Sequence, residues 1–175
     1  MSTVRPNFPR VIDATARKDW DMCPMRFYYN HIRKIRKRDG SIHLLFGQAL
    51  ARGLEEFRRT FYGEGLDVLH SFKRGVEGIS HHWGHNPSDD DNKKNLASCI
   101  LALQSYIEQY PPYEDRVRPA MFDGKPAVEF TFAVPIPGIT HPQTGEPLIY
   151  AGRFDMLADY EGMLFIEDDK TASQL

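Results

Sequence analysis

The sequence has few cysteines, no long apolar run and almost no net charge. Its 175 residues include only Cys23 and Cys99, too few for a disulfide framework, which favours a reducing cytoplasm. No segment approaches the roughly 18 consecutive apolar residues of a membrane span, and the N-terminal stretch lacks the apolar core of a signal peptide. A formal net charge of −2 gives no overall attraction to nucleic acid. We therefore expect a cytoplasmic protein without a membrane partner, in which contact with DNA would depend on local basic patches.

The first part of the sequence shows helical patterns of apolar residues, and the later part shows strand patterns. Residues 44–61 place apolar side chains every three or four positions, as an amphipathic helix does, and residues 96–107 do the same. The later sequence shows short runs rich in β-branched and aromatic residues, separated by glycine and proline. With 41% hydrophobic and 26% charged residues, the composition is typical of a globular protein. We expect one α/β domain over residues 1–175, with a helical part at residues 11–110 and a sheet at residues 126–173.

The acidic residues near the C-terminus fall where two strands of a hairpin would meet. If a two-residue loop at Glu161-Gly162 joins the strands, Asp155 lies opposite Asp168, with Cβ atoms about 4.5–5.5 Å apart. Carboxylates this close repel each other, and a divalent cation would remove the repulsion because it prefers oxygen ligands. Lys170, which alternation places on the same face, could then hold an attacking water or stabilise a phosphate. The alternative is that these acids are solvated on an edge strand.

Four motifs, taken in order, resemble those of a known nuclease family. The segments CPMRFYYNHI, LLFGQALARGLEEF, GRFDML and LFIEDDKTAS are similar to the motifs of the RecB-like branch of the PD-(D/E)XK nuclease superfamily, and they lie within about residues 14–173. The resemblance implies an α/β restriction-endonuclease-like core that hydrolyses DNA phosphodiester bonds, as an exonuclease or end-processing enzyme. It also implies Mg²⁺ or Mn²⁺ as cofactor, DNA as substrate, and recombination or repair proteins as partners.

The resemblance assigns roles to individual residues as well. It implies that Asp155 and Asp168 bind the metal ion, that the backbone carbonyl of Asp169 joins them, and that Lys170 is the catalytic lysine. Glu129 lies where relatives often carry an acidic residue that leads into the strands. We therefore expect these residues to meet in one site.

Two features depart from the family pattern. Where relatives have a histidine ligand this chain has Ala51, which cannot coordinate a metal; engineering, a branch without this ligand and a degenerate relative all stay open as explanations. Glu55 lies one turn further along the same helix face, so it could substitute or could simply be solvated. Relatives also continue beyond Lys170 with more sheet and a Q-x-x-x-Y helix, and no tyrosine follows Gln174 at that spacing. We therefore expect the domain to be C-terminally incomplete.

A basic patch near the N-terminus is a candidate DNA-binding surface. Five basic residues fall within six positions, directly after several aromatic ones, and four of them are the candidate contacts: Arg33, Lys34, Arg36 and Lys37. Such residues can neutralise phosphates while aromatic rings stack on bases. The same run could equally be a solvated helix end.

Cysteine and histidine offer weaker candidates. Cys23 matches a position where some relatives begin an iron–sulfur cluster, but such a cluster takes four thiolates, so we expect Cys23 to be a buried structural residue and the chain to lack a cluster. Imidazoles suit zinc, but no cysteine or acid stands at closed-site spacing from the histidines, which favours a polar loop: His70, His81, His82 and His85.

The sequence therefore supports two main functional hypotheses. The first is a metal-dependent deoxyribonuclease. The second is a catalytically inactive nuclease-like module that binds DNA or a partner protein, which Ala51 would allow. An unrelated, metal-free interaction domain is a third and less favoured interpretation.

Overall fold

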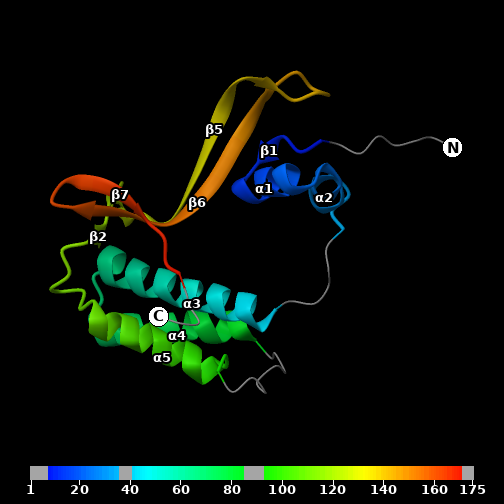
Figure 1. The fold of residues 1–175 in the computed structure, drawn as a ribbon. Coiled ribbons are helices and arrows are strands. Elements are labelled where there is room, and N and C mark those ends of the chain that lie inside the picture. The colour runs from blue at the N-terminus through cyan, green and yellow to red at the C-terminus, as the bar shows by residue number, and fades with distance from the viewer. Residues whose placement is uncertain (1–7, 36–40, 85–92, 171–175) are drawn as a thin grey trace. The chain divides into compact units, whose positions relative to one another are not determined.

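The computed structural model describes residues 8–35, 41–84 and 93–170. Within these ranges the chain forms α-helices and two β-sheets (Figure 1), so the expected mixed α/β class is confirmed. The chain divides into two compact units, which are described one at a time: Met1–Asp39 with Thr131–Arg153, and Gly40–Phe130 with Phe154–Leu175. The expected single domain over residues 1–175 stays a prediction.

The first unit consists of short N-terminal elements and the outer part of the long β5–β6 hairpin. Its elements are β1 (Val11–Ile12), α1 (Ala14–Met22), α2 (Pro24–Phe27), the π-helical turn η1 (Tyr28–Ile32), and parts of β5 (Val128–Thr140) and β6 (Pro147–Tyr160). Strand β1 pairs in parallel with β6, with Val11 opposite Ile149. The ring of Phe132 on β5 leaves no space at Gly152 on β6, where an added Cβ would lie 2.6 Å from the ring. The glycine of the GRFD motif is therefore required by packing.

Polar contacts join the helices of this unit. Asp13 caps α1, its carboxylate accepting a hydrogen bond from the Ala16 amide at 2.7 Å. On α1, Asp19 is only 4% exposed, and its carboxylate accepts hydrogen bonds from Asn30 Nδ2 at 2.8 Å and from His31 Nε2 at 3.0 Å. Arg26 Nε lies 2.7 Å from the other carboxylate oxygen. A buried carboxylate with this many donors ties α1 to the two turns that follow it.

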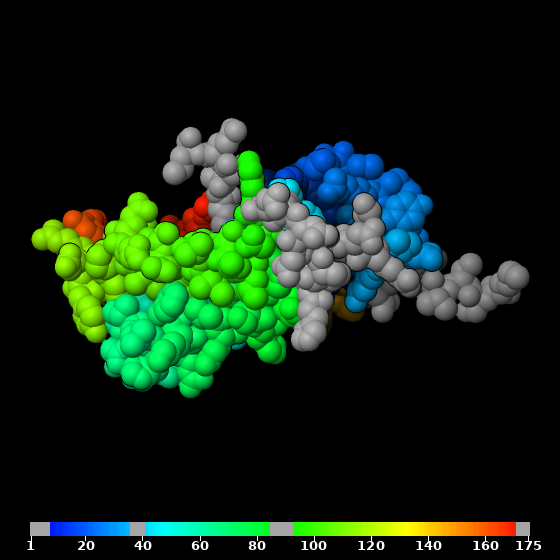
Figure 2. All heavy atoms as spheres, turned by 90° about the horizontal axis from the view of Figure 1, so that it is seen from below, coloured from blue at the N-terminus to red at the C-terminus, as the bar shows by residue number. Residues whose placement is uncertain are grey.

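The second unit contains the helical layer. Its helices are α3 (Ile42–Arg58), which continues into the π-helical turn η2 (Arg59–Gly63), α4 (Val68–Trp83) and α5 (Leu96–Gln109). Each of the three α-helices packs against the other two; Figure 2 shows the outer surfaces of α4 and α5 from below. The apolar stripe predicted for residues 44–61 faces the shared core, which contains Phe46, Ala49, Leu54, Phe57, Ile79, Trp83, Cys99 and Leu103.

Two glycines let α3 and α4 approach closely. A Cβ added to Gly75 would lie 2.9 Å from the backbone oxygen of Gly53 and 2.7 Å from Leu103 Cδ2. A Cβ added to Gly53 would lie 2.6 Å from Ile79 Cγ1. The core of the second unit is therefore close-packed around a backbone contact that a side chain would force apart.

The second unit also contains the hairpin that carries the acidic residues. Strands β2 (Arg118–Pro119) and β7 (Met163–Glu167) each pair antiparallel with β6, and β3 (Met121–Phe122) and β4 (Lys125–Pro126) form a separate ribbon. Leu157 lies opposite Ile166 and Tyr160 opposite Met163, which confirms the predicted register and its two-residue loop. Both loop residues have positive φ, 54° at Glu161 and 85° at Gly162, as a type I′ turn requires.

The turn, and not the apolar pattern, fixes this register. Strand β7 exposes apolar side chains on both of its faces, namely Met163, Leu164, Phe165 and Ile166. A one-residue slip would therefore bury no less apolar surface, and alternation alone could not specify the pairing. The tight turn and the Asp159 carboxylate, which accepts a hydrogen bond from the Gly162 amide at 2.8 Å, set the position of Asp168 relative to Asp155.

Candidate functional site

The end of the β6–β7 hairpin brings the predicted acidic residues together. The last ladder pair is Met156 with Glu167, so Asp155 and Asp168 follow directly beyond it. The two carboxyl groups lie close enough for each to shift the pKa of the other, and the Asp169 amide donates to Asp155 Oδ2 at 2.8 Å. The structure therefore places the two aspartates side by side, as the register predicts.

Lys170 also reaches this cluster. Its Nζ donates to Asp168 Oδ1 at 2.6 Å, and both side chains are exposed, the lysine at 76% and the aspartate at 55%. An exposed ion pair of this kind contributes little to stability, so exchanging its partner costs little. Lys170 can therefore move toward an anion that comes close to Asp168.

The two aspartates carry like charges, and their pKa values are shifted in opposite directions. Desolvation by burial raises the pKa of Asp155, the Asp169 amide works against that shift, and the neighbouring Asp168 adds to it. The hydrogen bond from Lys170 lowers the pKa of Asp168. A half-buried carboxylate next to another negative group is a poor arrangement for stability but a good one for attracting a cation.

The donors present at this point fit a hard divalent cation. Two carboxylates and a nearby main-chain carbonyl are oxygen ligands of the kind that Mg²⁺ and Mn²⁺ prefer. Among the described residues no group of three or more His, Cys, Asp or Glu side chains is arranged to hold a metal. Water or substrate oxygens would therefore complete the coordination of an ion between Asp155 and Asp168, as Mg²⁺ commonly requires.

Arg58, at the end of α3, is a residue that the motifs did not indicate. It is 3% exposed, and its guanidinium contacts Asp169 and Glu167, the two residues on either side of Asp168. Burial by itself would lower the pKa of Arg58, but Tyr106 and Asp169 more than offset that effect, so the pKa is raised. The one sequence signal was its spacing, because Arg58 follows Leu54 by four residues and so lies beside the apolar stripe of α3.

The accessory candidates on α3 and β5 are placed as follows. Ala51 precedes Arg58 by seven residues, two helical turns, so both lie on the same side of α3, about 10 Å apart along its axis. Glu55 pairs with Arg52 on its own helix. Glu129 on β5 has a φ of 49°, and its charge contributes to the raised pKa of Arg52, after Glu55 and Glu56. The metal-site roles of these three residues stay predictions.

The remaining candidates are only partly described. Arg33 and Lys34 are exposed after η1, and Lys34 has a φ of 54°, whereas Arg36 and Lys37 lie outside the described residues. His81 and His82 are exposed in the last turn of α4, His70 bonds to the carboxylate of Asp67, and His85 lies outside the described residues.

The expectation for Cys23 is wrong. Cys23 is exposed, because it occupies the junction between α1 and α2, where it is the N-cap residue of a four-residue helix that starts with Pro24. Cys99 is the buried cysteine: it is 0% exposed in the helical core, and burial raises the pKa of its thiol to about 12.

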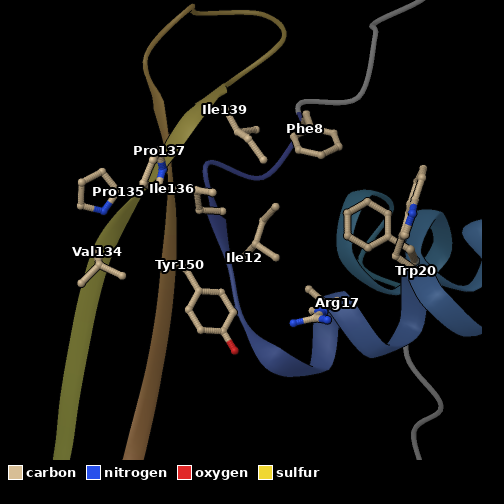
Figure 3. A pocket seen from close by; sticks show the side chains of 12 residues that line it. Phe8, Ile12, Arg17, Trp20, Val134, Pro135, Ile136, Pro137, Ile139 and Tyr150 are labelled. Carbon is tan, nitrogen blue, oxygen red and sulfur yellow. The ribbon is translucent and has the colours of Figure 1, made fainter.

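The first unit contains an apolar groove. Its volume is about 690 Å³, and its walls come from α1, α2 and the β5–β6 hairpin. Figure 3 shows the Arg17 guanidinium and the Tyr150 hydroxyl among otherwise mainly apolar side chains, including Ile12, Trp20 and Ile139. The groove lacks convergent polar groups, so its chemistry is that of an apolar surface and not of a catalytic centre.

No family model, no curated protein and no solved structure matches this chain. The nuclease family that the motifs resemble therefore stays a prediction. Within the described ranges, no helix combines the length and the apolar character that crossing a membrane would require.

Proposed function

We propose that this chain is a metal-dependent DNA nuclease with a restriction-endonuclease-like core, acting as an exonuclease or on DNA ends. The observation that carries the proposal is the cluster at the hairpin end, where the Asp169 amide lies 2.8 Å from Asp155 Oδ2 and Lys170 Nζ lies 2.6 Å from Asp168 Oδ1. Two neighbouring carboxylates with a lysine beside one of them are groups that phosphodiester hydrolysis with a divalent ion can use. The order of the sequence motifs supports the same assignment.

Each residue would contribute through its own chemistry. Asp155, Asp168 and the Asp169 carbonyl would hold Mg²⁺ or Mn²⁺, which when bound supplies an activated water and neutralises phosphate charge. Lys170 would leave Asp168 for the phosphate and stabilise the negative charge that develops there. Arg33 and Lys34, with Arg36 and Lys37, would bind the DNA backbone.

The competing proposal is a nuclease-like module that binds DNA or a recombination or repair protein without cutting. Ala51 supports it, because a metal ion at the cluster would lack one side-chain ligand. The ion pair between Lys170 and Asp168 also supports it, since that pair already satisfies one of the two carboxylates.

Cleavage of end-labelled single-stranded and duplex DNA in the presence of Mn²⁺ separates the two. We expect cleavage by the parent chain and its loss in Lys170→Ala, because the lysine stabilises the charge on the phosphate; metal binding should persist. Lys73→Ala is the matched control, since Lys73 is exposed on α4, which carries none of the site residues. If the parent chain and Lys170→Ala are equally inactive while both bind DNA, the binding module replaces the nuclease.

The DNA-binding patch has its own test. Neutralising Arg33, Lys34, Arg36 and Lys37 together should weaken DNA binding and flatten its dependence on salt, because each phosphate contact contributes to the salt slope. An unchanged affinity with an unchanged slope would exclude the patch as the DNA contact.

A further inference from the structure

The buried guanidinium of Arg58 makes four hydrogen bonds to three side chains. Nη1 donates to Asp169 Oδ2 at 2.7 Å, and Nη2 donates to Asp169 Oδ1 at 3.3 Å, to Glu167 Oε1 at 2.9 Å and to the Tyr106 hydroxyl at 2.7 Å. The guanidinium carbon lies 5.3 Å from the centroid of the Tyr106 ring. The adjoining cavity of about 20 Å³ has room for about one water molecule. Protein groups therefore hold this cation in one orientation.

The two carboxylates that Arg58 holds are the sequence neighbours of Asp168. Glu167 and Asp169 are two residues apart, so in an extended segment they lie on one side of the chain while Asp168 lies on the other. Strand β7 ends at Glu167, which means that ladder pairing does not reach Asp168 or Asp169. The contacts of Arg58 are what fix this segment from the α3 side.

This arrangement affects the hydrogen bond between the Asp169 amide and Asp155. The Asp169 amide donates to Asp155 Oδ2 at 2.8 Å, and the same residue's side chain is held by both arms of the Arg58 guanidinium. The bidentate contact restricts rotation of the Asp169 backbone. It therefore keeps the Asp169 amide on Asp155 and the Asp168 side chain on the opposite side of the segment.

We infer that Arg58 is the positioning residue of the candidate metal site: by binding Glu167 and Asp169 it sets the geometry in which Asp155, Asp168 and the Asp169 carbonyl face a cation. The inference rests on the proposed function for its metal ion, but the positioning of Asp169 against Asp155 can be measured without metal. Tyr106 supports Arg58 in this role by accepting a hydrogen bond from the same nitrogen that contacts Glu167.

The variant Arg58→Lys separates charge from geometry. Lysine keeps the positive charge but lacks the planar fork, so it cannot make the bidentate contact to Asp169 together with the bond to Glu167. Arg59→Lys is the matched control, because Arg59 is the next residue, has a side chain that is 52% exposed and pairs with Glu56 and Glu64 instead.

Two readouts on the intact chain test the inference. In Arg58→Lys we expect amide exchange at Asp169 to accelerate while the amide of Phe165, which pairs with Ala158 within the β6–β7 ladder, keeps its protection. We expect Mn²⁺ affinity, measured by calorimetry, to fall by about 10- to 100-fold, as it does when groups that orient metal ligands are removed. Arg59→Lys should change neither quantity. Equal acceleration at both amides would show that Arg58 only stabilises the fold, and would overturn the inference.

A second variant covers the case in which Arg58→Lys does not fold. Arg58→Met combined with Glu167→Gln and Asp169→Asn removes the buried cation together with its two half-buried partners, which such clusters often tolerate. If its stability recovers and its Mn²⁺ affinity stays weak, the positioning role stands; if both recover, it is overturned. A parent chain that binds no Mn²⁺, yet shows the selective exchange effect at Asp169, would contradict the proposed function and leave the positioning role intact.

Discussion

The two units of this chain differ in what stabilises the interior of each. In the second unit, three helices share an apolar core in which Ile79, Cys99 and Leu103 are each 0% exposed. The first unit has only three buried apolar residues among its described ranges, Ala16, Phe27 and Leu148, and relies on buried polar residues. Asp19 is one of these, and His141 is the other.

His141 illustrates the polar mode. Its Nδ1 accepts hydrogen bonds from the amides of Gln143 and Thr144 at 3.2 and 3.1 Å, so the proton must be on Nε2, which donates to the Phe8 carbonyl at 2.8 Å. The ring thereby ties the hairpin tip to the N-terminal segment. A unit held by such contacts should respond to pH and to the loss of single donors, whereas the helical core should respond to changes in volume.

The largest effect should come from Gly75→Ala in the helical core. The added methyl group would meet the Gly53 backbone oxygen at 2.9 Å, which cannot move without separating α3 from α4. We expect the free energy of unfolding to fall by about 1–3 kcal/mol, as for other overpacked cores. Denaturant titration followed by the fluorescence of Trp83, which is buried in this unit, measures it in a Trp20→Phe background.

Gly78→Ala on the same helix is the control. Its added methyl group would lie 3.0 Å from Glu56 Cγ, part of a side chain that can rotate away, and 3.3 Å from the Arg52 backbone oxygen, a milder contact than the 2.9 Å at Gly75. Alanine is favoured over glycine in a helix by about 1 kcal/mol, so this variant should be neutral or slightly stabilising. Equal losses at both glycines would show that the α3–α4 contact is not specially close.

A smaller and pH-dependent effect is expected from Asp19 in the first unit. The hydrogen bond from Asn30, followed by that from His31, lowers the pKa of this carboxyl group. A lowered pKa stabilises the folded unit above the ordinary pKa of about 3.9, and this contribution is lost as the pH falls through the folded-state value. Fluorine NMR of fluorotryptophan-labelled protein should therefore show the Trp20 resonance changing below about pH 4.

Two carboxamide variants test the origin of that change. Asp19→Asn should remove the acid transition at Trp20 and loosen α1 already at neutral pH, because one donor is left without an acceptor. Asp21→Asn is the control, since the Asp21 side chain is 63% exposed and its nearest cation, Arg17, is 3.7 Å away. An acid transition that survives in Asp19→Asn would mean that another group controls the first unit.

The smallest expected effect concerns the two cysteines, whose rates of alkylation should differ between the units. Cys23 is exposed in the first unit, and Cys99 is buried in the second with a pKa of about 12. At pH 8 the Cys99 thiolate fraction is roughly a thousandfold below that of an ordinary thiol with a pKa near 8.5. We expect alkylation of the native protein to modify Cys23 rapidly and Cys99 only when the core opens. Rapid modification of both would contradict the description of the helical core.

Much of this architecture follows from local sequence rules. The stripe in residues 44–61 predicts α3 and its buried face because apolar spacing is a property of one helix. The two-residue loop at Glu161-Gly162 predicts the hairpin register, since turn length alone determines which residues pair. The proximity of Asp155 and Asp168 then follows by counting along the two strands.

The parts that were not predicted depend on tertiary contacts. Arg58 meets Asp169 across 111 residues of sequence, and no local pattern encodes a partner at that distance. The motifs assigned a role to the backbone of Asp169 but none to its side chain or to Glu167, because both side chains pair with a residue of a distant helix. The exposure of Cys23 was missed for a similar reason: an apolar-looking residue at a helix junction is buried only if another element covers it.

The proposed function predicts that Asp155 and Asp168 hold a divalent cation and that Ala51 leaves one ligand position without a protein side chain. A calorimetric Mn²⁺ titration of the parent chain, of Ala51→His and of Asp155→Asn tests it most directly. We predict binding by the parent chain, affinity at least about tenfold tighter in Ala51→His because a ligand replaces a water, and loss of binding in Asp155→Asn. If histidine at position 51 leaves the affinity unchanged and Asp155→Asn still binds Mn²⁺ as tightly as the parent, the aspartate pair is not a metal site and the account is wrong.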